Sequence, residues 1–140
     1  MEAVGRSFID AFNRRDVRAL IELCDSQIAF YPTVLVGTLR EYRGHEGIRC
    51  WMSELESAEA AHRVRVREFR ELGGSRFLLL TEVLLGDELV SPSAMLARLG
   101  TEGLIVEARA YLSDEHTLVQ VGLIADRADT SQPSSRAHSR

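Results

Sequence analysis

Three side chains have types and positions suited to acid–base chemistry: Tyr31, His45 and Glu82. Tyr31 ends a short apolar segment directly before Pro32, where its phenol could donate a hydrogen bond to a ligand carbonyl. The alternative is a wall tyrosine whose hydroxyl binds solvent or backbone. A phenol has an ordinary pKa of about 10 and is a poor base at neutral pH, so we expect Tyr31 to act as a donor rather than as a base.

Glu82 interrupts an otherwise apolar segment, RFLLLTEVLL at 76–85. An unpaired buried carboxylate is costly, so this acid must face the surface, pair with an arginine, or lie in a pocket with a raised pKa. The alternation of strand side chains predicts a cross-strand ion pair between Glu82 and Arg109 on the outer face of a sheet. The stripe formed by Arg63, Arg65 and Arg67 is also expected to pair with acids such as Glu82 or Glu107. The alternative is a catalytic Glu82 that shuttles protons.

His45 lies in the sequence GHEG, which is typical of a helix start. We expect it to cap that helix or to face solvent, with a general base as the alternative. His62 is expected to be structural. No two histidines have the HxH or HxxxH spacing of metal ligands, so no metal site is predicted. Cys24 and Cys50 fit no metal or redox pattern and are expected to be two buried free thiols.

All 17 basic residues are arginine, and the absence of lysine excludes Schiff-base catalysis by a side chain and a P-loop lysine. Residues 1–126 carry 14 arginines against 20 acids, a net charge of −6, which disfavours nucleic acid as a partner. No apolar run reaches the roughly 18–20 residues that cross a bilayer, so no membrane association is expected. The first residues do not form a signal peptide, so a cytoplasmic location is expected by default.

Apolar spacing predicts three helices and a sheet. Val4, Phe8, Ala11 and Phe12 share one face of a first helix, and Asp16 is a good N-cap for a second helix over 17–24. A strand over 28–31, ended by Pro32, precedes a third helix over about 45–58. The remaining elements are four strands at about 62–69, 76–85, 91–99 and 104–112, and a short helix at 114–119.

This order predicts one α+β domain over residues 1–125, followed by a disordered polar tail over 126–140. In that domain a curved, mostly antiparallel sheet wraps around the helices and forms a cone with an open mouth. The interior of such a cone is a natural site for a small molecule.

Three local signatures suggest a relationship: FIDAFNRRDVRALIELC followed by IAFYP, then YRGHEGIRCWMSEL, then AYLSDEH. Over about residues 2–120 the chain resembles the nuclear-transport-factor-2-like (NTF2-like) superfamily and most of all its SnoaL-like branch, which includes relatives of polyketide cyclases and ketosteroid isomerases. The resemblance implies a cystatin-like cone, a small hydrophobic or aromatic ligand, no metal or organic cofactor, and a homodimer through the outer face of the sheet.

The catalytic pattern of ketosteroid isomerases is missing. Where those enzymes have a tyrosine on the first helix, an aspartate before a proline, and a second acid, this chain has Phe8, Tyr31 and Met95. The resemblance therefore transfers no catalytic set. It does imply a cavity lined by the inward faces of the third helix and the last strands, although core packing alone would also explain such residues. The residues expected to line it are Phe8, Trp51, Leu55, Met95, Ala108, Ala110 and Leu112.

Two functions remain open. In the first, the chain is a cofactor-free enzyme that carries out cyclisation, isomerisation or dehydration by proton transfer in an apolar cone. Tyr31 would be its hydrogen-bond donor, and His45 or an acid such as Glu82 would be its proton shuttle. In the second, the chain is a non-catalytic, homodimeric protein that binds a ligand or serves as an accessory protein.

Overall fold

Apolar spacing and one cap set the N-terminal helices, as the sequence predicts. The computed structural model describes residues 1–35 and 38–126. Helix α1 (Glu2–Asn13) buries Phe8 and Phe12, and helix α2 (Val17–Glu22) begins at Asp16, whose carboxylate accepts a 3.1 Å hydrogen bond from the amide of Ala19. The second helix ends two residues earlier than expected, because the chain from Cys24 onward pairs as a strand.

Strand β1 (Cys24–Leu35) is longer than the sequence suggests. The expectation that Pro32 ends it is wrong. Between Tyr31 and Val34 the register of β1 against its parallel neighbour shifts, and Pro32 falls in this irregular stretch. A proline is tolerated there because the irregular ladder needs no N–H donor at this position.

The strands form one mostly antiparallel sheet in the order β2-β1-β7-β6-β5-β4, with β3 paired to β1. Of the pairings among described residues, that of β1 with β7 is parallel and the others are antiparallel. The predicted α+β class is therefore confirmed. The remaining strands are β2 (Thr38–Leu39), β3 (Tyr42–Arg43), β4 (Arg63–Gly73), β5 (Arg76–Leu85), β6 (Glu88–Leu99) and β7 (Ile105–Tyr111).

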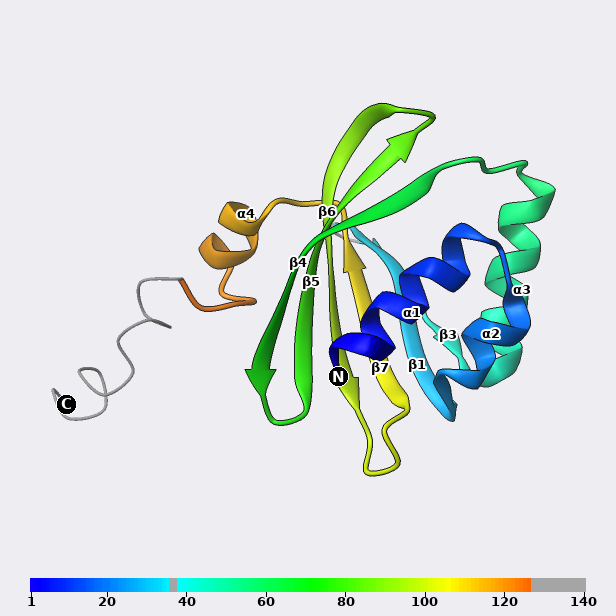
Figure 1. Cartoon of the computed structure of the whole chain (residues 1–140), viewed down its shortest axis with the longest axis horizontal. Coiled ribbons are helices and arrows are strands. Elements are labelled where there is room, and N and C mark those ends of the chain that lie inside the picture. The colour runs from blue at the N-terminus through cyan, green and yellow to red at the C-terminus, as the bar shows by residue number, and fades with distance from the viewer. Residues whose placement is uncertain (36–37, 127–140) are drawn as a thin grey trace, which may run out of the picture.

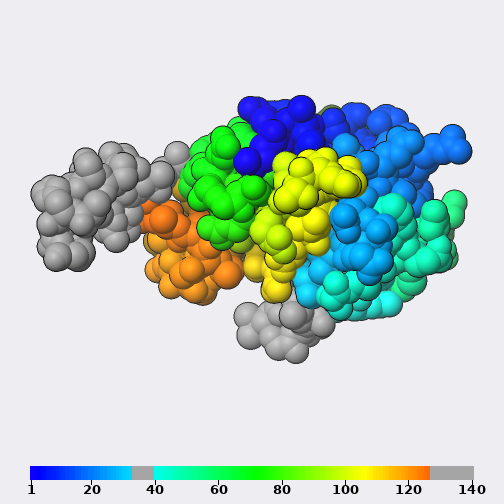
Figure 2. Space-filling view, turned by 90° about the horizontal axis from the view of Figure 1, so that it is seen from below, coloured from blue at the N-terminus to red at the C-terminus, as the bar shows by residue number. Residues whose placement is uncertain are grey.

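Helices cover the two faces of the sheet unequally. Helices α1, α2 and α3 (Gly44–Ser57) lie on one side, while the short α4 (Glu115–Gln120) lies on the other (Figure 1). From below, the dark blue α1 lies against the green and yellow strands, and the orange α4 region is on the far side of them (Figure 2). We call the face toward α1 the inner face and the face toward α4 the outer face.

Strand β5 is buried on both faces, as its continuous apolar sequence predicts. Phe77 and Leu79 belong to the inner core with α1 and α3, and Leu78 and Leu80 belong to a smaller outer cluster with Leu118 of α4. This alternation fixes the direction of every later side chain on the strand. The sheet can therefore carry a cavity on its inner face and ion pairs on its outer face.

The start of α3 depends on a close contact between backbones. A Cβ atom at Gly47 would lie 2.7 Å from the carbonyl carbon of Tyr42, a separation that real Cβ atoms essentially never show. Tyr42 is itself tied to α3, because its hydroxyl donates a hydrogen bond to Glu54. Gly47 therefore lets α3 approach β3, and it accounts for a residue that would otherwise only weaken the first helical turn.

We predict that Gly47→Ala lowers the free energy of unfolding by about 1–3 kcal/mol, because relieving the clash with Tyr42 requires backbone movement. Intrinsic helix propensity alone would predict the opposite sign. Ser53→Ala, at an exposed position of the same helix, is the control and should change stability by less than about 0.5 kcal/mol. Urea denaturation followed by circular dichroism measures both. An unchanged or raised stability of Gly47→Ala would contradict the prediction.

Candidate functional site

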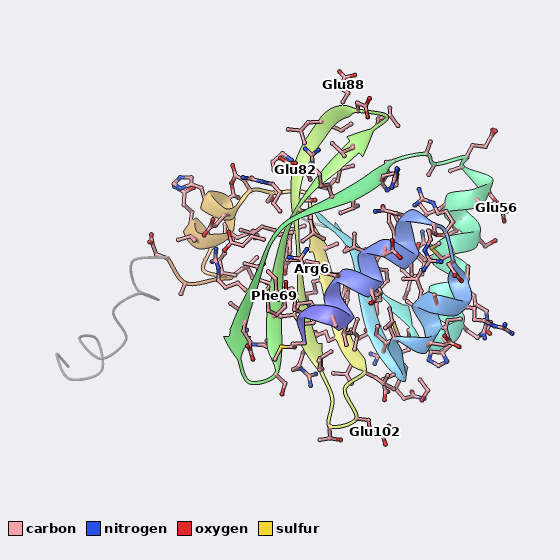
Figure 3. All side chains as sticks on the ribbon, viewed as in Figure 1. Arg6, Glu56, Phe69, Glu82, Glu88 and Glu102 are labelled. Carbon is pink, nitrogen blue, oxygen red and sulfur yellow. The ribbon has the colours of Figure 1, made fainter. Side chains whose placement is uncertain are left out.

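A cavity of about 460 Å³ lies between α1, α3 and the inner face of the sheet, at the end of the β5–β6 hairpin. The tip of this hairpin is marked by Glu88 in Figure 3. The volume of the cavity lies within the roughly 300–1,000 Å³ typical of small-molecule sites. The cavity is lined by Phe8, Ile9, Phe12, Phe30, Pro32, Trp51, Leu55, His62, Val64, Thr81, Val83, Leu85, Val90, Ser93, Ala94, Met95, Ala110, Tyr111 and Leu112.

Five rings in succession form one side of the cavity, which we call the aromatic wall: Phe8, Phe30, Trp51, Phe12 and His62. Successive ring centroids are 5.9, 4.6, 5.3 and 5.5 Å apart. The Phe12 and Trp51 rings are stacked with an interplanar angle of 14°, whereas the other contacts are tilted or edge-on. Contacts at these spacings hold the rings in place, so the wall presents a rigid aromatic surface to a ligand.

A buried pair of hydroxyls lies on the sheet side of the cavity. Thr81 of β5 and Ser93 of β6 are directly opposite in the ladder, and their oxygens are 2.6 Å apart. Both residues are buried, at 5% and 8% exposure. One hydroxyl donates to the other, and each oxygen can still take part in a further hydrogen bond, so the pair can hold a polar group of a ligand.

His62 ends the aromatic wall, in the link between α3 and β4. Burial lowers the pKa of its imidazole below the ordinary value, and the positive charge of Arg15 lowers that pKa further. The guanidinium of Arg15 donates hydrogen bonds of 2.8, 3.1 and 2.8 Å to the carbonyl oxygens of Phe12, Ala60 and His62. Because the ordinary pKa of histidine is about 6.5, this imidazole is neutral at neutral pH.

The rim of the cavity is apolar and exposed. Leu85 and Val90 of the β5–β6 hairpin are 54% and 60% exposed, and Leu112, just after β7, is 48% exposed. Such side chains give a ligand an apolar path from solvent to the aromatic wall.

The lining includes six of the seven side chains that the sequence predicts there, namely Phe8, Trp51, Leu55, Met95, Ala110 and Leu112. Ala108 is the exception. It faces inward, as alternation predicts, but it is fully buried in the core and does not line the cavity. The next inward residue, Ala110, lines the cavity with a small side chain and leaves volume open there.

Tyr31 points away from the cavity. Its neighbours Phe30 and Pro32 line the cavity, so alternation turns Tyr31 to the outer face. Its hydroxyl donates a 2.8 Å hydrogen bond to Glu41, and the guanidinium carbon of Arg109 lies 4.3 Å from its ring centroid. The hydrogen bond to Glu41 raises the pKa of this phenol. The expected hydrogen bond from Tyr31 to a ligand in the cone has no support in this arrangement.

Glu82 also lies on the outer face, since its neighbours Thr81 and Val83 line the cavity. The predicted pair between Glu82 and Arg109 is wrong. Strand β6 lies between β5 and β7, whereas β4 is the direct neighbour of β5 and places Arg65 opposite Glu82. Glu82 therefore pairs with Arg65 at 2.6 Å, and Arg67 lies 3.8 Å from the same carboxylate.

His45 is bound to the backbone outside the cavity. Its Nε2 lies 2.9 Å from the carbonyl oxygen of Cys24 and must carry the proton, because a carbonyl only accepts. Both cysteines are free, as expected, but only Cys24 is buried, and burial raises the pKa of its thiol to about 12. The expectation that Cys50 is buried is wrong, because it lies on the solvent side of α3.

The structure thus brings together residues that the sequence did not single out for the site: His62, Thr81 and Ser93. Alternation puts Thr81 on the face of β5 opposite Glu82, and this is the one signal in the sequence that points to Thr81. Among the described residues, no group of histidine, cysteine and acidic side chains could hold a metal ion. Over the same residues, none of the helices has both the length and the hydropathy needed to span a membrane.

No family model matches the sequence, and neither does any curated protein. Solved structures do match. An NTF2-like protein of unknown function from Mesorhizobium loti is 23% identical, with a TM-score of 0.64 over 80% of this chain and 89% of its own. A candidate isomerase of the SnoaL-like family from Agrobacterium tumefaciens is 15% identical, with a TM-score of 0.66 over 79% and 95%. This chain has the NTF2-like fold.

A third structural neighbour is named for a different activity. A candidate polyketide cyclase from Sinorhizobium meliloti is 17% identical, with a TM-score of 0.61 over 77% of this chain and 93% of its own. The resemblance read from the sequence is therefore confirmed for the fold. At these identities the likeness establishes no activity, since one fold carries many functions. The function of this NTF2-like chain must be argued from its own cavity.

We predict that Thr81→Val lowers the free energy of unfolding by about 1–3 kcal/mol, because it leaves the buried Ser93 hydroxyl without its partner. The double variant Thr81→Val/Ser93→Ala should lose less than the sum of the two single variants, by about 1 kcal/mol. Urea denaturation measures the cycle, with Thr101→Val in the exposed β6–β7 turn as the control. Additive losses would show that the two hydroxyls do not interact.

Proposed function

We propose that this NTF2-like chain binds a small, planar, largely apolar metabolite in its cavity and carries out cofactor-free proton transfer on it. The reaction class is cyclisation, isomerisation or dehydration. The aromatic wall carries this proposal, because five adjoining rings favour a flat ligand that can stack against or meet their edges. The names of the Agrobacterium and Sinorhizobium neighbours, an isomerase and a polyketide cyclase, support the same class.

The cavity has few polar groups, and they are of two chemical types. His62 offers a neutral imidazole at one end of the aromatic wall, and Thr81 with Ser93 offers hydroxyls on the sheet side. Tyr111 also lines the cavity, but its ring belongs to the outer cluster with Leu118. A ligand would thus be oriented by two polar contacts within an apolar enclosure, the arrangement that gives small-molecule sites their specificity.

The alternative is a non-catalytic protein that binds such a ligand for storage, transport or sensing. One observation favours it. Tyr31, His45 and Glu82 are all engaged with other groups away from the cavity. Catalysis would then depend on His62 alone, and if His62 takes no part, binding is what remains.

We predict that Ala110→Phe weakens binding of the neutral dye N-phenyl-1-naphthylamine by about tenfold or more, since the added ring occupies the cavity. Trp51 is the single tryptophan of the chain and lines the cavity, so its fluorescence reports occupancy directly. Saturable quenching of Trp51 by the dye measures affinity. Ala3→Phe, at an exposed position of α1, is the matched control and should bind as the parent does.

The result separates the cavity from other apolar surface. Equal affinities of the parent and Ala110→Phe would place the dye elsewhere, and no quenching of Trp51 in the parent would contradict ligand binding in the cavity. Circular dichroism of Ala110→Phe checks that the fold survives the larger side chain.

A homodimer through the outer face is part of the proposal. That face carries positive and negative side chains side by side. The carboxylate of Glu107 lies 3.3 Å from the guanidinium of Arg109 on the same strand and 3.9 Å from that of Arg98 on β6. Two copies related by a two-fold axis can set arginine against acid in both directions. The charge pattern supports such an interface.

We predict a particle of about twice the 15.7 kDa chain mass in light scattering at micromolar concentration. Glu107→Arg should shift the parent dimer toward monomer, because it places like charges across the two-fold interface. Glu102→Arg, in the turn at the far end of the sheet, is the matched control (Figure 3). A monomeric parent at that concentration would contradict the homodimer.

A further inference from the structure

His62 is the ionisable side chain that the aromatic wall presents to the cavity. Its ring contacts Phe12, whose other contacts are with Trp51 and with the guanidinium of Arg15. No hydrogen bond within the described part of the chain occupies the imidazole, although its backbone carbonyl is bound by Arg15. A neutral imidazole in this setting has a free lone pair available to a ligand.

The backbone around His62 is held from both sides by the segment that follows α1. The side-chain amide of Asn13 donates to the carbonyl of Val64 at 2.8 Å and accepts from its N–H at 2.8 Å. Arg15 binds the carbonyls of Ala60 and His62. These bonds fix the chain directly before and after His62, so Asn13 and Arg15 are positioning residues for the imidazole.

Its surroundings keep the imidazole in the basic form. The neighbouring lining residues are apolar on every element that packs here: Phe12 on α1, Trp51 and Leu55 on α3, and Val64 on β4. Arg15 is the charged group whose field lowers the pKa of His62, in addition to burial. A base whose pKa lies below neutral is unprotonated at working pH and can accept an activated proton.

We infer that His62 is the catalytic base of the cavity and that the ligand class is a neutral planar molecule with an acidic C–H or O–H at the His62 end of the aromatic wall. This inference rests on the proposed function. In the step, the imidazole lone pair takes the proton, and the electron pair of the broken bond stays in the conjugated system of the ligand. The imidazolium then returns the proton to another atom of the ligand or to water, which restores the neutral base.

The Kemp elimination of 5-nitrobenzisoxazole tests this role with a known probe. The substrate is small, planar and neutral, and its reaction needs only a base. The base removes the C3 proton, the C–H electrons form a nitrile, and the N–O bond breaks to release a coloured phenolate. Because the chain has no lysine, no side-chain amine competes with the histidines as base.

The parent should accelerate this elimination with saturation kinetics. Its kcat should rise with pH through one pKa below about 6.5 and then stay constant, as the neutral imidazole is the active form. His62→Gln should lower kcat by about a hundredfold or more. His116→Gln, at an exposed position of α4, is the matched control and should leave kcat unchanged.

Quenching of Trp51 by the same probe separates the two levels of the argument. Saturable quenching together with an elimination rate that is equal in the parent and in His62→Gln would overturn the role of His62 and leave ligand binding standing. The absence of quenching would contradict both proposals. A parent pH profile without an inflection below about 6.5 would overturn the role of His62 even if His62→Gln failed to fold.

Discussion

The architecture depends on the burial of β5 from two directions. Phe77 and Leu79 pack against α1 and α3, while Leu78 and Leu80 pack under α4. A strand covered on both faces fixes the curvature of its neighbours, because neither face can rotate toward solvent without exposing apolar area. The inner residues change character along the strand, from Phe77 to the smaller and polar Thr81, and this change divides a filled core from an open cavity.

Two close contacts position the helices that line the cavity. Asn13 binds the backbone of Val64 in both directions, so the end of α1 is fixed to β4. Gly47, in the first turn of α3, allows that helix to approach β3 closely. Between these two constraints, the rings of Phe12 and Trp51 stack and form a wall instead of filling the space in front of them.

The helices, the strands and the face on which each strand side chain lies could be predicted from the sequence. The ion-pair partners across strands could not be decided from it. Strand alternation puts Thr81 and Glu82 on opposite faces of β5, as observed, because the alternation of neighbouring side chains is a local property. The partner of Glu82 depends on which strand lies beside β5. Because β4 is that neighbour, the pairing with the arginine stripe is confirmed through Arg65, and the pairing with Arg109 is wrong. Tyr31 lies within β1 rather than at its end, since the strand continues past Pro32, and alternation turns its side chain away from the cavity. His62 has no periodic signature, because it lies in a link whose position only the fold determines.

The charges around the cavity also select among ligands. Arginine supplies all the basic side chains, and Arg15, beside His62, donates its hydrogen bonds to the carbonyls of Phe12, Ala60 and His62. Within the described part of the chain, no arginine lines the cavity. An anionic ligand would lose its hydration without gaining a counter-charge, which is a cost of several kcal/mol or more in apolar surroundings. In the proposed role of His62, a neutral ligand becomes negative only while the imidazole carries its proton, so the new negative charge forms beside a positive one. The apolar lining of the cavity therefore favours neutral ligands over ligands that enter already ionised.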